Sequence, residues 1–434
     1  MRRLIATLCL ILLTLGLAMP AAARVYIDIT QPFSKKLPLA LSQFQPLPEA
    51  AQDPIGAEGA QMLQRYLGYT GLFDFMDPKS FLGAPALEKV DYRRWTRIGA
   101  ELLITGGYKL SGGIFTLELR LFDITEGKLL VGRRYDGRTA DLGAMLARFS
   151  DDVMLALTGE RSIYSTMIAF VGSRERIKEV YLMRFDGSGV RNLSKKGDIS
   201  LYPAWSPDGA LVAYSSYVKR RPAILVHALA GGSGKVIINK PGVNLTPAFR
   251  PQHQGQLAAA LSYTGQNNIF LADLAGKIIK RLTDGWGIEV APSFSPDGKR
   301  MAYVSDRGGN PQIYVLDLTN GTNRRITFGH KYCAAPAWSP RGDRIAYQAQ
   351  VNGTFQVATI RPDGSDTKVL NAGWGGGEDP TFSPDGRLIA YASRRTGRYQ
   401  ICLMTAGGEY ITRLTNLPGE QTDPAWSPRG IMVK

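Results

Sequence analysis

A serine between glycines is the first feature of this sequence that could carry chemistry. The segment Gly231–Lys235 reads Gly-Gly-Ser-Gly-Lys, which approaches the G-x-S-x-G turn that exposes a hydrolase nucleophile. It lacks the final glycine, and it fails as a phosphate-binding loop because Val236 stands where such loops carry Ser or Thr. We therefore expect an ordinary turn at this position and no catalytic serine.

Carboxylates are the second candidate, since they could bind Ca²⁺ or dock a partner if the fold gathers them. Five of them precede the proline of a recurring aromatic-x-Pro motif by five to nine residues: Asp198, Glu289, Glu378, Asp379 and Asp423. The three histidines stand at unrelated distances from these motifs, so symmetry cannot gather them into a ring of metal ligands: His227, His253 and His330. Whether the carboxylates meet depends on the elements that carry them.

The motif itself organises most of the chain. An aromatic residue, then Ser or Arg, then Pro, recurs six times and is usually completed as W-S-P-D-G, F-S-P-D-G or W-S-P-R-G. Its prolines are spaced 44, 45, 44, 44 and 44 residues apart: Pro207, Pro251, Pro296, Pro340, Pro384 and Pro428. A regular period in the forties is typical of WD40-like propeller blades with four strands each.

Each period has the content of such a blade. After the motif comes a short apolar strand with an Ala-Tyr pair, then a second strand such as Gln312–Leu318, then an outer strand such as Arg325–Thr327. The pairs are Ala213-Tyr214, Ala302-Tyr303, Ala346-Tyr347 and Ala390-Tyr391. Nothing in these periods has helical spacing, so we predict an all-β propeller.

The two ends of the repeat region complement one another. Asp423–Trp426 has the pattern of an innermost strand without partners, whereas Met167–Val171 and Val180–Phe185 look like partners without an inner strand. We predict that residues 161–434 form six blades closed by the C-terminal strand, which leaves no free sheet edge. The loops before the inner strands then meet at one channel mouth. There the five carboxylates form turn and capping groups, a docking rim or a weak Ca²⁺ site.

Residues 24–160 have a different sequence pattern, with both helical and strand segments, which predicts an N-terminal α/β domain. Apolar residues at helical spacing predict helices over Ala57–Leu67 and Asp141–Leu157. The proline-containing segment Gln31–Asp53 is expected to be mostly loop. Strands are predicted over Val25–Ile29, Ala100–Gly107, Ile114–Asp123 and Lys128–Tyr135.

The first residues indicate export. Two arginines precede an apolar run, Leu4–Ala18, and Ala21–Ala23 supplies a small-residue cleavage pattern. We expect a signal peptide over residues 1–23, cleaved between Ala23 and Arg24. The mature chain is expected to have no transmembrane segment, because this run is shorter than the roughly 20 apolar residues that a span needs.

Export changes the expected net charge of the mature chain and raises the question of a disulfide. The chain has 52 Lys and Arg against 37 Asp and Glu, a net charge of +15, and loss of Arg2 and Arg3 with the signal peptide leaves +13. Outside the cytoplasm this excess favours the anionic envelope, and we expect no nucleic-acid partner. Cys333 and Cys402 occupy different strand positions in different repeats, so we expect two free thiols and not a disulfide.

The signal segment, the N-terminal domain and the six W/F-S-P-D-G-type repeats together resemble the TolB family, the periplasmic propeller proteins of the Tol-Pal system. The resemblance implies a non-enzymatic periplasmic adaptor without a cofactor, which supports outer-membrane integrity and constriction during cell division. It implies that the channel face binds the lipoprotein Pal. It also implies that an extended segment over residues 24–36 binds TolA, which links the protein indirectly to TolQ and TolR.

Carried over by position, the resemblance implies a set of Pal-facing residues in the loops that lead to the inner strands: Tyr202, Asn244, Thr246, Glu289, Val290, Ala335, Glu378, Asp379 and Asp423. The implied TolA-binding segment begins with Arg24, Val25, Tyr26, Ile27, Asp28 and Ile29. The second repeat departs from the pattern, since Phe249–Gln252 reads Phe-Arg-Pro-Gln and Ala258-Ala259 replaces the Ala-Tyr pair. An enzyme that acts on envelope polysaccharide is the alternative function.

Overall fold

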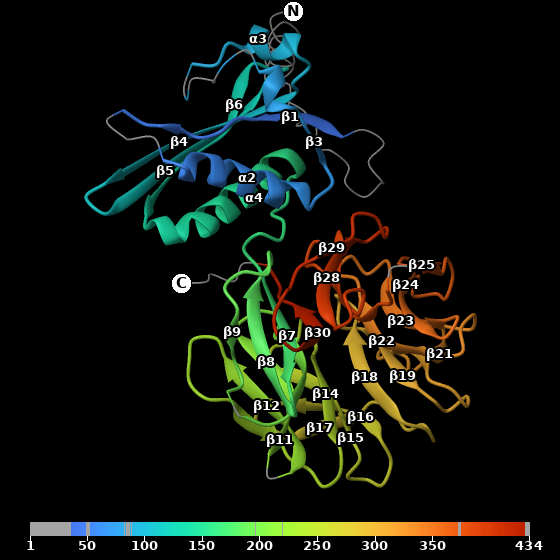
Figure 1. The fold of residues 1–434 in the computed structure, drawn as a ribbon. Helices are drawn as coiled ribbons and strands as arrows, with labels where there is room; N and C mark the ends of the chain where they lie inside the picture. The colour runs from blue at the N-terminus through green and yellow to red at the C-terminus, as the bar shows by residue number, and fades with distance from the viewer. Residues whose placement is uncertain are drawn as a thin grey trace, which may run out of the picture.

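Figure 1 shows the computed structural model of the chain, in which an α/β domain stands on a β-propeller. The structure describes residues 36–429, apart from residues 49–52, 82, 84–86, 88, 196, 219 and 372–374. The predicted signal peptide, the predicted strand Val25–Ile29 and all but the last residue of the segment 24–36 lie outside the described residues. No helix in the described part of the chain is long and apolar enough to cross a membrane.

A mixed sheet forms the centre of the N-terminal domain. Its strands are β1 (Leu37–Leu41), β2 (Gln45–Pro46), β3 (Phe73–Phe75), β4 (Leu102–Ser111), β5 (Ile114–Asp123) and β6 (Lys128–Gly137). They lie in the order β3-β1-β4-β5-β6, and β2 pairs with β4 beyond the end of β1. The three predicted strands form the antiparallel meander β4-β5-β6, while β1 runs parallel to both of its neighbours.

The prediction of a mostly looped segment over Gln31–Asp53 is wrong where β1 and β2 form. Proline has no N–H for a ladder, which made this segment look irregular. Pro38 lies at the start of β1, before pairing with β4 begins between Leu39 and Leu102, so its missing N–H removes no bond from that ladder. Its carbonyl still accepts the Glu101 N–H at 3.1 Å, and the apolar residues that follow are buried.

Two long helices cover the face of this sheet that is turned towards the propeller (Figure 1). They are α2 (Ile55–Gly68) and α4 (Leu142–Thr158), and both were predicted from their apolar spacing. The short helix α3 (Tyr92–Arg97) lies on the other face, where Trp95 packs against Leu103. Single turns of 3₁₀ helix occur at η1 (Pro78–Ser80) and η2 (Thr139–Asp141).

The propeller consists of six antiparallel sheets of four strands, as predicted. Blade 1 contains β10 (Ser200–Trp205), β11 (Leu211–Val218), β12 (Arg221–Ala228) and β13 (Lys235–Ile238). Blade 2 contains β14 (Asn244–Phe249), β15 (Gln256–Leu261), β16 (Asn268–Asp273) and β17 (Ile278–Arg281). Blade 3 contains β18 (Glu289–Phe294), β19 (Arg300–Ser305), β20 (Gln312–Asp317) and β21 (Asn323–Arg325).

The remaining blades follow the same order from inner to outer strand. Blade 4 contains β22 (Cys333–Trp338), β23 (Ile345–Val351), β24 (Thr354–Ile360) and β25 (Lys368–Val369). Blade 5 contains β26 (Glu378–Phe382), β27 (Leu388–Ser393), β28 (Gln400–Thr405) and β29 (Thr412–Arg413). Blade 6 combines β30 (Glu420–Trp426) with β7 (Met167–Arg174), β8 (Ile177–Arg184) and β9 (Arg191–Asn192).

The predicted closure of the ring by the C-terminal strand is confirmed. Strand β30 pairs antiparallel with β7, with Thr422 opposite Val171 and Ala425 opposite Ala169. The Ser427 N–H continues this contact by donating to the Met167 carbonyl at 2.9 Å. The first and last parts of the propeller therefore share one sheet.

In blades 1, 3 and 5 the Ser-Pro-Asp-Gly sequence closes the inner hairpin through its side chains as well as its backbone. In blade 3 the Ser295 hydroxyl donates to Asp297 at 2.5 Å and accepts the Arg300 N–H at 2.9 Å, while Gly298 adopts a φ of 66°. The same bonds recur in blades 1 and 5. Serine and aspartate thus satisfy the turn, and glycine supplies the left-handed backbone that it requires.

The buried Ala-Tyr pairs fill the space between blades, and blade 2 shows how their loss is compensated. The tyrosines of the four pairs are almost fully buried: Tyr214, Tyr303, Tyr347 and Tyr391. In blade 2 the equivalent position is Ala259, and the residue directly opposite it on the next strand is the buried Phe270. The aromatic volume therefore comes from the neighbouring strand of the same sheet.

The N-terminal domain rests on the propeller face that carries these turns. The Tyr66 hydroxyl of α2 donates to Asp186 at 2.7 Å, and the Lys36 ammonium donates to the Tyr410 hydroxyl at 2.5 Å. One apolar core runs from helices α2 and α4 into blades 5 and 6. The inner strands begin at the opposite face, as the arrow of β18 in Figure 1 shows by pointing towards the N-terminal domain.

Removal of residues 423–434 is expected to abolish the cooperative unfolding transition of the propeller. The deletion leaves β7 without its inner partner and breaks the sheet that joins the first and last parts of the ring. Circular dichroism during heating would measure this. A chain that ends at Arg429 keeps β30 and is the control, and an unchanged transition in the shorter chain would contradict the role assigned to closure.

Candidate functional site at the channel mouth

The inner strand of every blade is interrupted by a β-bulge at the same position. In blade 1, Tyr202 and Pro203 together face the single residue Tyr214 on the second strand. The first residue of each bulge has a φ between 49° and 55° and precedes a proline: Tyr202, Thr246, Ala291, Ala335, Asp379 and Asp423. The six bulges lie at the start of the inner strands and so surround one mouth of the channel.

Positive φ is strained for a residue with a β-carbon, and a β-branched residue such as Thr246 is a genuine outlier. Contacts from neighbouring blades hold these residues in place. The Ala291 N–H donates to the Thr246 hydroxyl at 3.1 Å, and the Asp379 N–H donates to the Gln348 side-chain oxygen at 3.0 Å. Backbone strain of this kind gathers at functional surfaces, and bulges re-aim side chains, so the ring marks this mouth as the candidate site.

Several side chains of the ring lie close together across the channel. Tyr202 of blade 1 is near enough to Asp423 of blade 6 and Asp379 of blade 5 for their charges to act on its hydroxyl. Burial, followed by the charges of these two aspartates, raises the pKa of Tyr202 to about 12. The structure therefore brings together three of the residues that the sequence assigned to the channel face.

Both aspartates have raised pKa values. Burial, followed by the charges of Asp423 and Glu378, raises the pKa of Asp379 well above its ordinary value. Burial raises the pKa of Asp423 to about 6, although a hydrogen bond from Thr422 and the charge of Lys178 on β8 oppose the shift. The two carboxyls therefore keep a proton at pH values where isolated carboxyls have lost theirs.

Asn244 and Glu289 do not reach the surface of the mouth. Each is 0% exposed at the first residue of its inner strand. The Asn244 amide donates to the Lys240 carbonyl at 2.7 Å, and Glu289 accepts from the Asn268 amide at 3.0 Å and from the Gly285 N–H at 3.2 Å. These two residues brace the loops that lead to the mouth.

The other assigned residues are at least partly exposed. Val290 and Ala335 are half-buried next to or within a bulge, and Glu378 is half-buried beside Asp379. The Tyr399 hydroxyl donates to Glu378, which fixes this carboxylate at the edge of the mouth. Asp198 is exposed in the loop that precedes β10.

The same face carries exposed apolar side chains that the sequence reasoning missed. Trp286 is 91% exposed and Ile288 is 53% exposed in the loop before β18, and Phe328 is 72% exposed in the loop before β22. The Arg325 guanidinium lies 4.7 Å from the centre of the Phe328 ring. The sequence signal that could have located Trp286 and Phe328 is their position within three residues after the threonine that follows an outer strand.

Behind the mouth the channel is neutral. A cavity of about 540 Å³ is lined by the proline, alanine, aromatic and serine residues of all six inner strands, and Arg429 is the one charged residue in that lining. No acidic residue lines this cavity, so the carboxyls that face the channel lie at the mouth opposite the N-terminal domain. A partner that is recognised through charge would therefore contact the mouth and not the channel wall.

Metal ligands and thiols do not add to this site in the part of the chain that the structure describes. Among these residues no group of three His, Cys, Asp or Glu side chains is arranged to hold a metal ion. Cys333 and Cys402 are free and buried, as predicted, and burial raises the pKa of each thiol to about 11.

An α/β domain seated on a closed six-bladed propeller, with a polar mouth on the free face, defines a class of two-domain propeller proteins. Residues 155–430 match the TolB beta propeller domain, and residues 25–130 match the TolB amino-terminal domain. The chain belongs to the TolB family.

Relatives and solved structures agree with this assignment. The Tol-Pal system protein TolB of Desulfosudis oleivorans is 41% identical over 287 residues, which are 64% of this chain and 65% of that protein. The TolB homolog of Chlorobium chlorochromatii is 36% identical over 69% of each chain. The crystal structure of TolB from Acinetobacter baumannii superposes with a TM-score of 0.79 at 26% identity, over 91% of this chain and 97% of that chain.

The acidic pair is expected to make the folded protein less stable as the pH rises from about 4 to about 6. The folded state binds the proton of Asp423 more tightly than the unfolded state does, so folding loses that advantage as the proton leaves. Asp423→Asn should reduce this loss by about 1 kcal/mol. Denaturant unfolding at several pH values would measure it, with Asp198→Asn as the control on the same face. An identical pH profile in wild type and Asp423→Asn would contradict the assignment.

Proposed function

We propose that this protein is a non-enzymatic adaptor of the Tol-Pal system in the periplasm. In this proposal residues 24–160 form the N-terminal domain, residues 161–434 form the propeller, the channel mouth binds Pal and the N-terminal segment binds TolA. TolQ and TolR are reached indirectly through TolA. The adaptor would support outer-membrane integrity and constriction during cell division.

The ring of strained bulges is the observation that carries the proposal. Six residues in the left-handed region, each costing on the order of 1 kcal/mol or more, surround a mouth that the N-terminal domain leaves uncovered. Such a cost at one symmetric position favours a binding surface over a purely structural turn. Family membership and the similarity to the Tol-Pal system protein TolB of Desulfosudis oleivorans favour a Tol-Pal partner for that surface.

Two chemically different parts of the mouth define the partner that it fits. Trp286, Ile288 and Phe328 offer apolar anchors on blades 2 to 4, and aromatic anchors dominate the binding energy of many interfaces. Asp379 and Asp423 offer carboxyls on blades 5 and 6. A partner with an apolar ridge over the first group and a hydrogen-bond donor or a basic side chain over the second would complement both.

The N-terminal segment is assigned to TolA on the resemblance alone, since residues 24–35 lie outside the described residues. Lys36 is the one described residue of this segment, and its ammonium also lies 4.8 Å from the centre of the Tyr410 ring. Tyr410 belongs to the turn between β28 and β29, on the propeller face opposite the mouth. The two proposed partners therefore meet the protein on different faces.

One observation favours the enzymatic alternative. Paired carboxyls with raised pKa values, such as Asp379 and Asp423, are also the groups that polysaccharide hydrolases use as acid and base. Turnover of envelope polysaccharide by the purified protein, lost in Asp379→Asn, would support that reading. We favour the adaptor because the bulges occur in all six blades, whereas the acidic pair occurs once.

Trp286→Ala and Phe328→Ala are each expected to weaken Pal binding about tenfold or more, because truncation of an exposed aromatic anchor typically costs over 1 kcal/mol. Glu378→Lys should also weaken it by placing a charge of opposite sign beside the acidic pair. Calorimetric titration with the soluble domain of Pal would measure these affinities.

Ile279→Ala is the matched control for the aromatic variants. Ile279 is an exposed apolar residue on the outer strand β17, away from the mouth, so its removal should leave the affinity unchanged. Equal affinity of wild type and all three mouth variants would refute the assignment of Pal to this face.

Deletion of residues 24–35 is expected to abolish TolA binding and leave Pal binding intact, because the two proposed surfaces lie on separate parts of the chain. A pull-down from envelope extract with the deleted and full-length mature chains would compare both partners. Retention of TolA by the deleted chain would overturn the assignment of this segment.

A further inference from the structure

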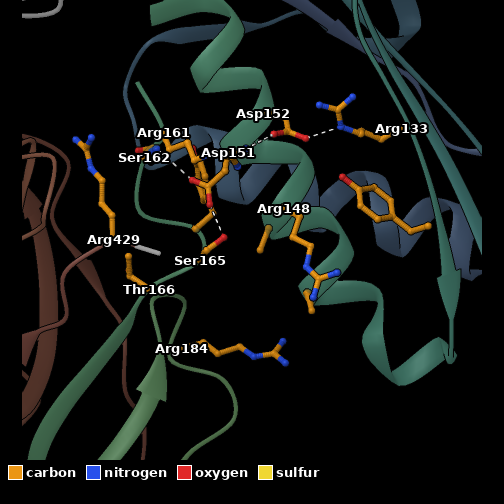
Figure 2. Close-up of a pocket in the computed structure, with 14 residues that line it drawn as sticks. Arg133, Arg148, Asp151, Asp152, Arg161, Ser162, Ser165, Thr166, Arg184 and Arg429 are labelled. Carbon is orange, nitrogen blue, oxygen red and sulfur yellow. Dashed lines mark hydrogen bonds and ion pairs between the residues drawn. The ribbon is translucent and has the colours of Figure 1, made fainter. Parts of the chain in front are cut away.

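A second cavity lies between the two domains. It has a volume of about 510 Å³ and is lined by β6, α4, the linker over residues 161–166, the end of β8 and Arg429 beyond β30 (Figure 2). Both domains and the C-terminal end of the ring thus contribute to its wall. It lies apart from the channel mouth, on the side of the propeller that carries the N-terminal domain.

Arginines dominate the charge of this cavity. Five line it, against two aspartates: Arg133, Arg148, Arg161, Arg184 and Arg429. Asp152 is paired with Arg133 at 2.6 Å and with Arg161 at 3.2 Å. Arg429 is paired with Glu160 at 3.1 Å.

The other aspartate is satisfied by neutral donors. Asp151 accepts the Ser162 N–H at 3.1 Å and the Ser165 hydroxyl at 2.5 Å, and Figure 2 shows all three beside the linker. Burial nevertheless raises its pKa above the ordinary value. Neither acid of the lining is therefore left to neutralise the remaining arginines.

Arg148 and Arg184 are those remaining arginines. Within the described residues their guanidinium groups form no ion pair and donate no hydrogen bond. Arg148 comes from α4 of the N-terminal domain, and Arg184 comes from the end of β8 in the propeller (Figure 2). The charge of Arg184 acts on Asp141 without forming an ion pair with it. Two like charges that line one cavity without an ion-pair partner make that cavity favourable for an anion.

Two tyrosines lie in the same wall, but their hydroxyl groups are buried away from the cavity. Tyr164 is 2% exposed, and its buried hydroxyl has no hydrogen-bond partner among the described residues. The Tyr135 hydroxyl on β6 is also buried without a hydrogen-bond partner among the described residues. The guanidinium groups of Arg148 and Arg184, which are exposed or half-buried, are therefore the donors that a ligand in the cavity can reach.

We infer that this interdomain cavity binds an oxyanion, a carboxylate or a phosphate group, between Arg148 and Arg184. Guanidinium groups bind both kinds of oxyanion through paired N–H donors. Because its two arginines come from different domains, a bound anion would link α4 to β8 and hold the domains together. This inference does not depend on the partners proposed above.

The test uses the mature full-length protein with inorganic phosphate and with citrate as probes, titrated calorimetrically at low ionic strength up to about 10 mM, which covers weak millimolar sites. Saturable binding of citrate alone would assign the site to carboxylates, and saturable binding of phosphate would assign it to phosphate groups. Absence of saturable binding of both probes would overturn the inference.

Variants then locate the site. Arg148→Gln with Arg184→Gln should weaken binding at least tenfold. Arg93→Gln with Arg97→Gln removes the same charge from α3, on the other face of the N-terminal sheet, and should change binding less than twofold. Equal losses of binding in the two double variants would show that the effect depends on net charge alone and would overturn the assignment.

Hydrogen exchange on the wild-type protein provides a readout that does not depend on the folding of any variant. Bound phosphate or citrate should slow exchange in α4 and in the linker over residues 161–166, relative to the mouth loops. Binding without protection in these two segments would contradict the proposed location.

Discussion

The pairing of β30 with β7 is the interaction on which the rest of the structure depends. Closure gives β7 its inner partner, so the sheet edges that remain are those of a propeller, which are short and protected. The closing strand also joins the domains, because the Trp426 indole N–H donates to the Thr166 hydroxyl of the linker at 2.8 Å. Trp426 further belongs to the apolar core that contains α2 and α4 of the N-terminal domain. Closure therefore determines both the channel and the seat of the N-terminal domain.

Closure also separates two faces with different chemistry. Turns of the Ser-Pro-Asp-Gly type and the N-terminal domain occupy one face, where cationic side chains surround the interdomain cavity. Bulges, carboxyls and exposed aromatic residues occupy the other face. The channel between them is lined mainly by neutral side chains, so neither set of charges extends into it. A protein arranged in this way can present separate surfaces to separate ligands.

The repeat, the blade count and the closure could all be predicted, because a spacing of 44 residues and an unpartnered strand at each end are visible in one dimension. The helices α2 and α4 were predictable for the same reason, since their apolar periodicity is local. Strand β1 was not, because it lies in a proline-containing segment and is stabilised by partners distant in the sequence. The face of the candidate site was predicted, while the buried positions of Asn244 and Glu289 were not.

By itself the sequence determined the architecture, since turn chemistry and strand alternation are properties of short segments that repeat. It also contained a hint of the bulges, in the second proline that stands four residues before each motif proline, such as Pro203 before Pro207. Only the tertiary structure decided which carboxyls meet, because Asp379 and Asp423 come from different blades and their burial depends on the closed ring. It likewise decided that Arg148 and Arg184 line one cavity, since electrostatic effects depend on distance in space and not on separation along the chain.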